Sequence, residues 1–440
     1  MGGGLLQLVA YGAQDAYLTG NPHITFWKIL YKRHTNFAME AFRVNFTGAP
    51  VYGQRVVAVV NRNADLLWKT YVEITLPDTT AAKTGKTYDV VWTGALTRRL
   101  GYQMLQQIEV EIGGQVIDRH YGEWLYVWET LTADYDTASK LDSMVNNGTY
   151  NGTNGIATSS ETCNGRPNVL YVPLQFWFNR NPGLALPLIA LQYHEVRFNI
   201  TLSDATDLVS KGAWTSVAQA AANLPQLKDM ALYIDYVYLD VDERRRFAQE
   251  SHEYLIEQLQ YTGQQQISTS SARLDLTLNH PVKELIWMFQ DARKTDCGST
   301  TTNSAGFTQP FIYDNIVDRC RLQINGQDRF DERYGDYFWK VQPYQHHTAG
   351  PTAGWPNNAG SAANNPINVY SFAVRPEEHQ PSGTCNFSRI DNATLVFDSV
   401  TSGGGESFPS KAVPYNFRVY AVNYNVFRIM SGMGGLAYSN

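Results

Sequence analysis

The sequence of 440 residues predicts an all-β protein made of two β-sandwiches in tandem. Short runs of β-branched and aromatic residues recur along the chain, as expected for strands. A motif occurs twice, about half a chain apart, which indicates duplication of a whole sandwich. The chain is also too long for one ordinary sandwich, so two domains are expected.

The predicted strands follow one another with little helical periodicity between them. The run 66–76 shows the pattern well, because its later part alternates apolar and polar residues and Pro77-Asp78 ends it. Runs of this kind cover residues 55–61, 66–76, 107–112, 168–178, 195–202, 231–239, 273–278, 284–289, 321–324, 368–374, 394–397 and 415–427.

Long loops rich in Gly, Asn, Ser, Thr and Ala separate several of these strands. Loops of such length are uncommon inside a compact domain and usually have a function. A sandwich with tight turns at one end and large loops at the other is typical of a jelly roll. The long loops cover residues 134–167, 203–229, 291–310, 342–366 and 399–414.

The repeated motif covers Ile108–Trp128 and Cys320–Trp339. Each copy has a strand, a Gly-Gly or Asn-Gly pair, and then Tyr-Gly, an acidic residue and an aromatic residue. Gly and Asn tolerate positive φ, so both pairs predict two-residue hairpin turns. The distance between the copies is much longer than a solenoid repeat, so the pattern favours a duplicated sandwich.

Charged residues concentrate between the two halves of the chain. Asp242 and Glu243 precede Arg244, Arg245 and Arg246, and this order of charges suits a short helix with its dipole. The three arginines are too few for a typical polybasic membrane-binding cluster. They are therefore candidate interface residues that form ion pairs with a neighbouring domain or subunit.

Composition narrows the class of function. The net charge of −6 argues against direct genome binding, which needs a basic face. Only 17% of residues are charged and 13% are aromatic, which favours surfaces that are buried against partners. The four cysteines form no CxxC pair, so free thiols are expected and a zinc ribbon is not.

The sequence has no recognisable motif for a catalytic, cofactor or metal site. His346-His347 lies in a Gly, Pro and Asn-rich segment, and the expected structure is a surface loop. Asn147 and Asn151 are Asn-x-Ser/Thr sequons on a long loop and are candidate glycan sites, although chance occurrence is the simpler explanation. Paired carboxylates could still meet in space, as in glycoside hydrolases.

Four segments in the same order resemble the major capsid proteins of nucleocytoplasmic large DNA viruses, and among them most closely those of phycodnaviruses, which infect algae. The resemblance covers nearly the whole chain, apart from the long loops. Its most specific parts are GNPHITFWKILYKRHTNFA at Gly20–Ala38, the charged segment Asp242–Leu259, PSGTCNFSRI at Pro381–Ile390, and the C-terminal segment Asn423–Tyr438.

The resemblance implies a double jelly roll, that is, two eight-stranded sandwiches with long inserted loops and a few short helices. It also implies a homotrimer that forms pseudo-hexagonal capsomers of an icosahedral virion shell, assembled in the host cytoplasm. Expected partners are the chain itself, neighbouring capsomers, and minor capsid and penton proteins. The inner viral membrane is expected nearby, and host surface glycans are a further candidate partner.

The expected domains are an N-terminal arm (1–24), a first jelly roll (25–242), a linker (243–253) and a second jelly roll (254–440). Two alternatives stay open from the residues alone. One is a glycan-binding sandwich that uses aromatic loop residues such as Trp355. The other is a jelly-roll hydrolase, which would need a concave site with convergent carboxylates.

Overall fold

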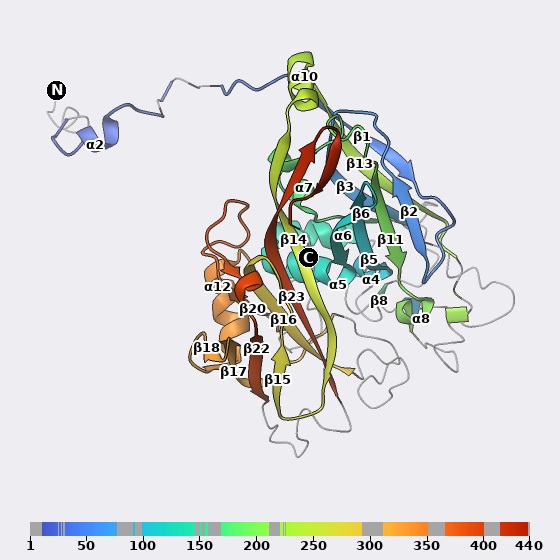
Figure 1. Ribbon diagram of the computed structural model, residues 1–440, viewed down its shortest axis with the longest axis vertical. Helices are drawn as coiled ribbons and strands as arrows, with labels where there is room; N and C mark the ends of the chain where they lie inside the picture. The colour runs from blue at the N-terminus through green and yellow to red at the C-terminus, as the bar shows by residue number, and fades with distance from the viewer. Residues whose placement is uncertain are drawn as a thin grey trace. The chain divides into compact units, whose positions relative to one another are not determined.

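Strands in the described chain pair into two β-sandwiches, each with two antiparallel sheets (Figure 1). The computed structural model describes residues 11–24, 26–27, 29, 31–76, 91–92, 99–145, 150–151, 155–156, 169–210, 221–222, 224, 226–292, 311–350, 366–399 and 414–438. Residues Met1–Phe37, with the short helix α2 (Ala16–Thr19), form one unit, and Ala38–Asn440 form a second unit that holds both sandwiches.

The first sandwich has one sheet in the order β1-β13-β3-β10, with β9 also paired to β3, and a second sheet in the order β2-β11-β5-β6. Its strands are β1 (Phe37–Asn45), β2 (Arg55–Val59), β3 (Leu66–Thr75), β5 (Leu105–Ile112), β6 (Gln115–Tyr121), β9 (Val169–Pro173), β10 (Leu186–Pro187), β11 (Val196–Leu202) and β13 (Asp229–Leu239). Two small ribbons pair β4 (Val91–Trp92) with β12 (Val209–Ser210) and β7 (Tyr150–Asn151) with β8 (Gly155–Ile156).

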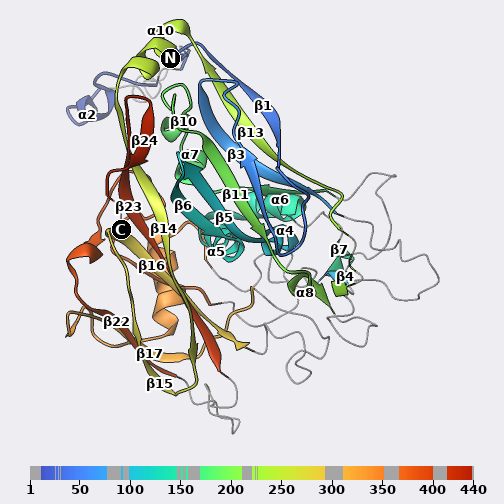
Figure 2. The ribbon, with the colours of Figure 1, turned by 45° about the vertical axis from the view of Figure 1, so that its right-hand side comes forward.

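Short helices connect these strands. They are α4 (Leu100–Met104), α5 (Gly122–Thr132), α6 (Tyr135–Val145), α7 (Trp177–Arg180), η3 (Pro182–Leu184) and α8 (Ala205–Leu208). A further helix, α10 (Val241–Gln249), joins β13 to the first strand of the second sandwich at one end of both sandwiches (Figure 2).

The second sandwich has a sheet in the order β14-β23-β16-β20, extended by β21 and β24, and a sheet in the order β15-β22-β17-β18, extended by β19. Its strands are β14 (His252–Ile267), β15 (Ser271–Asp275), β16 (Pro281–Asp291), β17 (Val317–Ile324), β18 (Gln327–Asp328), β19 (Arg333–Tyr334), β20 (Asn368–Ser371), β21 (Cys385–Asn386), β22 (Ala393–Ser399), β23 (Tyr415–Met430) and β24 (Met433–Leu436). Its helices are η4 (Tyr337–Val341), α12 (Gln342–His346) and η5 (Phe387–Arg389).

The two sandwiches repeat the same topology, which confirms the predicted duplication. In each, the first strand lies at the edge of one sheet beside the last long strand. The repeated motif also occupies equivalent places. Gly113-Gly114 and Asn325-Gly326 form hairpin turns with positive φ, as predicted. A Cβ atom on Gly122 would lie 2.0 Å from a backbone carbonyl oxygen, and one on Gly335 would lie 2.2 Å from such an oxygen.

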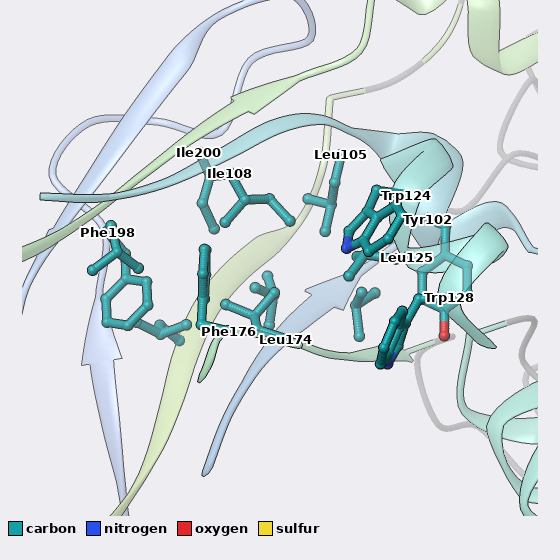
Figure 3. Close-up of a cluster of buried hydrophobic side chains, with 14 of the residues drawn as sticks. Tyr102, Leu105, Ile108, Trp124, Leu125, Trp128, Leu174, Phe176, Phe198 and Ile200 are labelled. Atoms are coloured by element: carbon teal, nitrogen blue, oxygen red, sulfur yellow. The ribbon is translucent and has the colours of Figure 1, made fainter. Parts of the chain in front are cut away.

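Alternating apolar residues fill the first sandwich. Phe198 and Ile200 on β11 point inward with Ile108 on β5, and all three are fully buried. Figure 3 shows how Phe176 and the α5 residues Trp124 and Trp128 continue this cluster beyond the strands. Helix α5 is apolar on nearly all sides because it is buried on nearly all sides.

The central strands β16 and β23 of the sheet β14-β23-β16-β20 are buried on both faces. Leu285 and Trp287 belong to the core of the second sandwich, whereas the intervening residues Ile286 and Met288 belong to the apolar cluster of the first sandwich. This alternation follows from the two-residue period of a strand. The first sandwich therefore covers the outer face of that sheet.

Most of the predicted strands are present, but some predictions were wrong. The run 168–178 is a strand only as far as Pro173, and helix α7 begins at Trp177. The segment 134–167 was predicted as a loop, but it begins with helix α6. No strand was predicted at β14, which begins at the end of the expected linker 243–253 and lies mostly within the expected second jelly roll.

Candidate functional site

The predicted arginine cluster lies on the exposed helix α10, between the sandwiches in the chain. Arg244 forms an ion pair with Asp65 of the first sandwich, with its Nε atom 2.9 Å from the Oδ1 atom. Asp65 is buried and also accepts a hydrogen bond from the backbone of Leu239. Arg246 pairs with Glu250 one turn later. Arg245 is exposed and forms no ion pair within the described part of the chain.

The other residues singled out from sequence are only partly described. Asn147 and Trp355 lie outside the described residues. Asn151 ends the two-residue strand β7, and its side chain is outside the described part. Among the residues that the structure describes, no group of His, Cys, Asp and Glu side chains could hold a metal ion. Cys320 and Cys385 are free thiols.

The junction of the two sandwiches contains a polar cluster around Glu123, in the first turn of α5. Its carboxylate pairs with Arg418 of β23 at 2.7 Å. It also accepts hydrogen bonds from the hydroxyl groups of Tyr420 at 2.7 Å and Tyr313 at 3.1 Å. All three partners belong to the second sandwich, so one carboxylate of the first sandwich binds three groups of the second.

Burial sets the protonation of these groups. Burial raises the pKa of Tyr420 and of Tyr313, and the Glu123 carboxylate adds to both shifts. Burial, the largest single cause, lowers the pKa of Arg418, but Glu123 together with Tyr313, Tyr420 and Tyr261 outweighs burial and the net shift is upward. Arg418 also donates to the side chains of Gln264 and Gln290. The arginine therefore stays charged and the tyrosine hydroxyl groups stay protonated as donors.

A second polar cluster at the junction surrounds Glu257 of β14. Arg180 of the first sandwich lies 3.0 Å from this carboxylate, and Lys283 of β16 lies 2.7 Å from it. Burial raises the pKa of Glu257, but Arg180, His379 and Lys283 outweigh burial and lower the pKa to about 2. The Glu257 carboxylate is therefore ionised at neutral pH and links the sandwiches as a charge.

Apolar and aromatic contacts surround the two clusters. Tyr261 and Tyr420 stack with ring centroids 4.9 Å apart, and Tyr121 of the first sandwich lies against both rings. Tyr126 of α5 stacks on Phe311 of the second sandwich at 4.8 Å. A cavity of about 320 Å³ lies beside these rings. The junction is therefore an apolar contact with charged groups set into it.

His347 contradicts the prediction of a surface loop. Its side chain is fully buried, with Nε2 3.0 Å from Glu284 and Nδ1 2.9 Å from Glu377. Burial lowers the pKa of His347, but the two carboxylates outweigh burial and raise it to about 9. Helix α12 ends at His346, and His347 follows in extended conformation. His347 acts as a cation that holds this segment to β16.

Known protein families match both halves of the chain. Residues 25–240 match the family "Major capsid protein N-terminus", and residues 243–435 match "Large eukaryotic DNA virus major capsid protein". The major capsid protein of Pyramimonas orientalis virus is 46% identical, and the match covers 100% of both chains. The chain belongs to the major capsid proteins of large eukaryotic DNA viruses.

Solved structures agree with this family. A quasi-atomic model of the PBCV-1 virus capsid matches with a TM-score of 0.75 and 36% identity, over 94% of this chain and 100% of that chain. The Faustovirus major capsid protein matches with a TM-score of 0.69 at 12% identity, over 96% and 94% of the two chains. These matches confirm the double jelly roll, and the relative from an algal virus confirms the predicted family.

Sequence reasoning did not find the junction residues of this capsid protein. Glu123 stands inside the repeated motif, whose acidic position is shared with Asp336, but the motif alone does not show which copy is buried. Tyr420 and Glu123 are 297 positions apart, so their contact depends on the packing of the two sandwiches. The one available signal was the acidic residue within an otherwise aromatic segment.

Proposed function

We propose that three copies of this capsid protein close into a pseudo-hexagonal capsomer and that these capsomers tile an icosahedral virion shell. The observation that supports this proposal is the duplicated topology of the two sandwiches. Three copies present six similar lobes, so a three-fold object can fit among six neighbours. Closed point-group symmetry is the usual arrangement of identical subunits.

Native mass spectrometry of the purified protein, together with negative-stain imaging, tests this assembly. One chain has a mass of 49.5 kDa, so a trimer has a mass of roughly 150 kDa by closed three-fold symmetry. A species of that mass with hexagonal outlines supports the proposal. A monomer that persists when the protein is concentrated contradicts it, provided that co-expressed viral proteins do not restore the trimer.

The proposed role is structural and not enzymatic. The matching relatives are capsid proteins, and they support a role in which surfaces bind other copies. Within the shell we expect tight burial inside each capsomer and weaker contacts between capsomers, because weak contacts let misplaced capsomers dissociate. The acidic net charge supports a position in the shell without direct genome binding.

Further partners follow from the position in a shell. Minor capsid and penton proteins, the inner viral membrane and host glycans are proposed partners, and assembly is proposed to take place in the host cytoplasm. Within the unit Met1–Phe37, Phe26 and Trp27 are 97% and 88% exposed, which supports partner binding by this unit. We propose the same domain limits as above, with Arg244–Arg246 as an interface element of the linker.

A further inference from the structure

The contact between the two sandwiches of one chain joins two different surfaces, which we name the donor side and the acceptor side. These names refer to the packing of the surfaces and not to hydrogen bonds. The donor side belongs to the first sandwich. It begins at Tyr121, the last residue of β6, and continues with Glu123 and Trp124 of α5. The acceptor side is the outer face of the sheet β14-β23-β16 in the second sandwich, with Ile286 and Tyr420. The contact is therefore heterologous, because two different surfaces meet.

Duplication gives each sandwich both kinds of surface. The chain itself uses the donor side of the first sandwich and the acceptor side of the second. Among the residues that the structure describes, the equivalent acceptor side of the first sandwich and the equivalent donor side of the second sandwich do not make this contact. A heterologous contact can repeat from copy to copy until the ring closes.

The unused acceptor side is the outer face of the sheet β1-β13-β3, extended by β9. It carries three tyrosines in contact, which we name the tyrosine face: Tyr71 and Tyr233 stack with ring centroids 5.2 Å apart, and Tyr171 lies 6.1 Å from Tyr71. All three remain partly exposed, Tyr171 by 37%. The carboxylates of Glu73 and Asp235 lie close enough to raise the pKa of Tyr71, after burial, the larger cause.

The corresponding face of the second sandwich shows what covering such a face does. There Tyr420 is 1% exposed and Ile286 and Met288 are fully buried, because the first sandwich packs on them. The tyrosine face has the same place in the fold and the same outward direction. It differs in that the described part of Ala38–Asn440 leaves its three tyrosines partly exposed.

The unused donor side begins at Tyr334, the last residue of β19. In the repeated motif Tyr121, Glu123 and Trp124 correspond to Tyr334, Asp336 and Tyr337. Tyr334 is 63% exposed, and Asp336 is exposed and pairs only with groups of its own sandwich.

Continued without gaps beyond the motif, the alignment places Tyr344 opposite Leu131, with the π-helical turn η4 before Tyr344 and no such turn in α5. Leu131 is fully buried, and its carbonyl accepts a hydrogen bond from Ala349 of the second sandwich. Tyr344 is 88% exposed. Tyr344 is thus exposed where the equivalent residue of the first sandwich is buried, and Tyr334 is exposed where Tyr121 is half-buried. Large aromatic residues exposed in this way indicate a surface that another molecule covers.

We propose that the donor side of the second sandwich, Tyr334–Tyr344, packs on the tyrosine face of a second copy of this chain. The contact repeats between copies the arrangement that already joins the two sandwiches within a chain. Both surfaces carry charges of both signs, with Asp336 and Lys340 on the donor side and Glu73, Asp235 and Lys69 on the tyrosine face, so ion pairs can add to the aromatic packing across the contact. This inference rests on the proposed trimer and specifies which surfaces meet in it.

Hydroxyl-radical footprinting of the wild-type protein tests the contact without any variant. In the single chain Tyr344 is 88% exposed and Tyr438 is 63% exposed, so Tyr344 should be labelled more strongly when no other chain covers it. In the assembled protein we expect labelling of Tyr344 and Tyr334 to fall several-fold relative to Tyr438, together with that of Tyr171. A trimer in which Tyr344 is labelled as strongly as Tyr438 overturns the inference and leaves the trimer itself standing.

Variants test whether the protected surfaces hold the trimer together. Replacement of Tyr71 and Tyr233 by Ser, or of Tyr334 and Tyr344 by Ser, is expected to give monomers at concentrations where the wild type is trimeric. Tyr438→Ser is the matched control and should stay trimeric. Circular dichroism verifies that each variant is folded. If the variants of both surfaces are folded and their trimers dissociate at the same concentration as the wild-type trimer, the inference is overturned. A wild type that is itself monomeric overturns the proposed function as well.

Discussion

Replacing Glu123 is expected to weaken the junction of the two sandwiches more than any exposed charge replacement. In Glu123→Ala the charge of Arg418 loses its carboxylate, and the hydroxyl groups of Tyr420 and Tyr313 lose their acceptor. The Arg418 side chain is only 7% exposed, so water replaces the lost partner poorly.

Removing one partner of a buried ion pair costs about 3–5 kcal/mol. The side-chain amides of Gln264 and Gln290 still accept hydrogen bonds from Arg418, which places the expected loss near the lower end of that range. We therefore expect Glu123→Ala to lower the free energy of unfolding by about 3 kcal/mol. Glu123→Gln should cost less, because its carbonyl oxygen can still accept a hydrogen bond from a tyrosine.

Urea unfolding, followed by tryptophan fluorescence and circular dichroism at equal protein concentration, measures the loss. The matched control is Glu253→Ala, because Glu253 also pairs with an arginine of β23 at 2.7 Å, but the two side chains are 59% and 47% exposed. Exposed pairs contribute about 0–1 kcal/mol, so this variant should unfold close to the wild type. Equal losses in the two variants would refute the assignment of Glu123 as the link between the sandwiches.

Three further predictions use the same reasoning. The pKa of His347 is about 9 in the fold and about 6.5 when unfolded, so its stabilising contribution is complete below pH 6.5 and is lost as pH rises to 9; urea unfolding of His347→Gln should lack that slope. Gly122→Ala should lower the free energy of unfolding in urea by about 1–3 kcal/mol through overpacking. The Cβ of Ala at the exposed Gly114 meets no atom, so that variant strains only φ. Arg244→Glu should impair trimer stability or shell assembly and also reduce thermal stability, whereas Arg245→Glu should leave thermal stability unchanged; unchanged trimers and shells in both would exclude an interface role.

The fold was predictable where strands are regular and the repeat is strong. The edge strand β14 was missed because polar and charged residues lie along it, and several of them bind the first sandwich instead of solvent. Helix α5 was missed because burial on all sides removes the apolar stripe of an ordinary helix. Both misses lie at the junction, where tertiary contacts replace the periodic patterns that sequence analysis uses.

The two copies of the repeated motif show how duplication separates folding from assembly. Gly122 and Gly335 serve the same local purpose, since each lets the chain pass a neighbouring carbonyl. The next residue has diverged in its surroundings: Glu123 is half-buried and pairs with the buried Arg418, whereas Asp336 is exposed and pairs with Lys340. A contact made within one chain forms at any concentration, whereas the equivalent contact between chains depends on concentration. The first copy can therefore contain a strong buried charge pair, and the second copy suits weaker, exposed groups that stay soluble until another chain covers them.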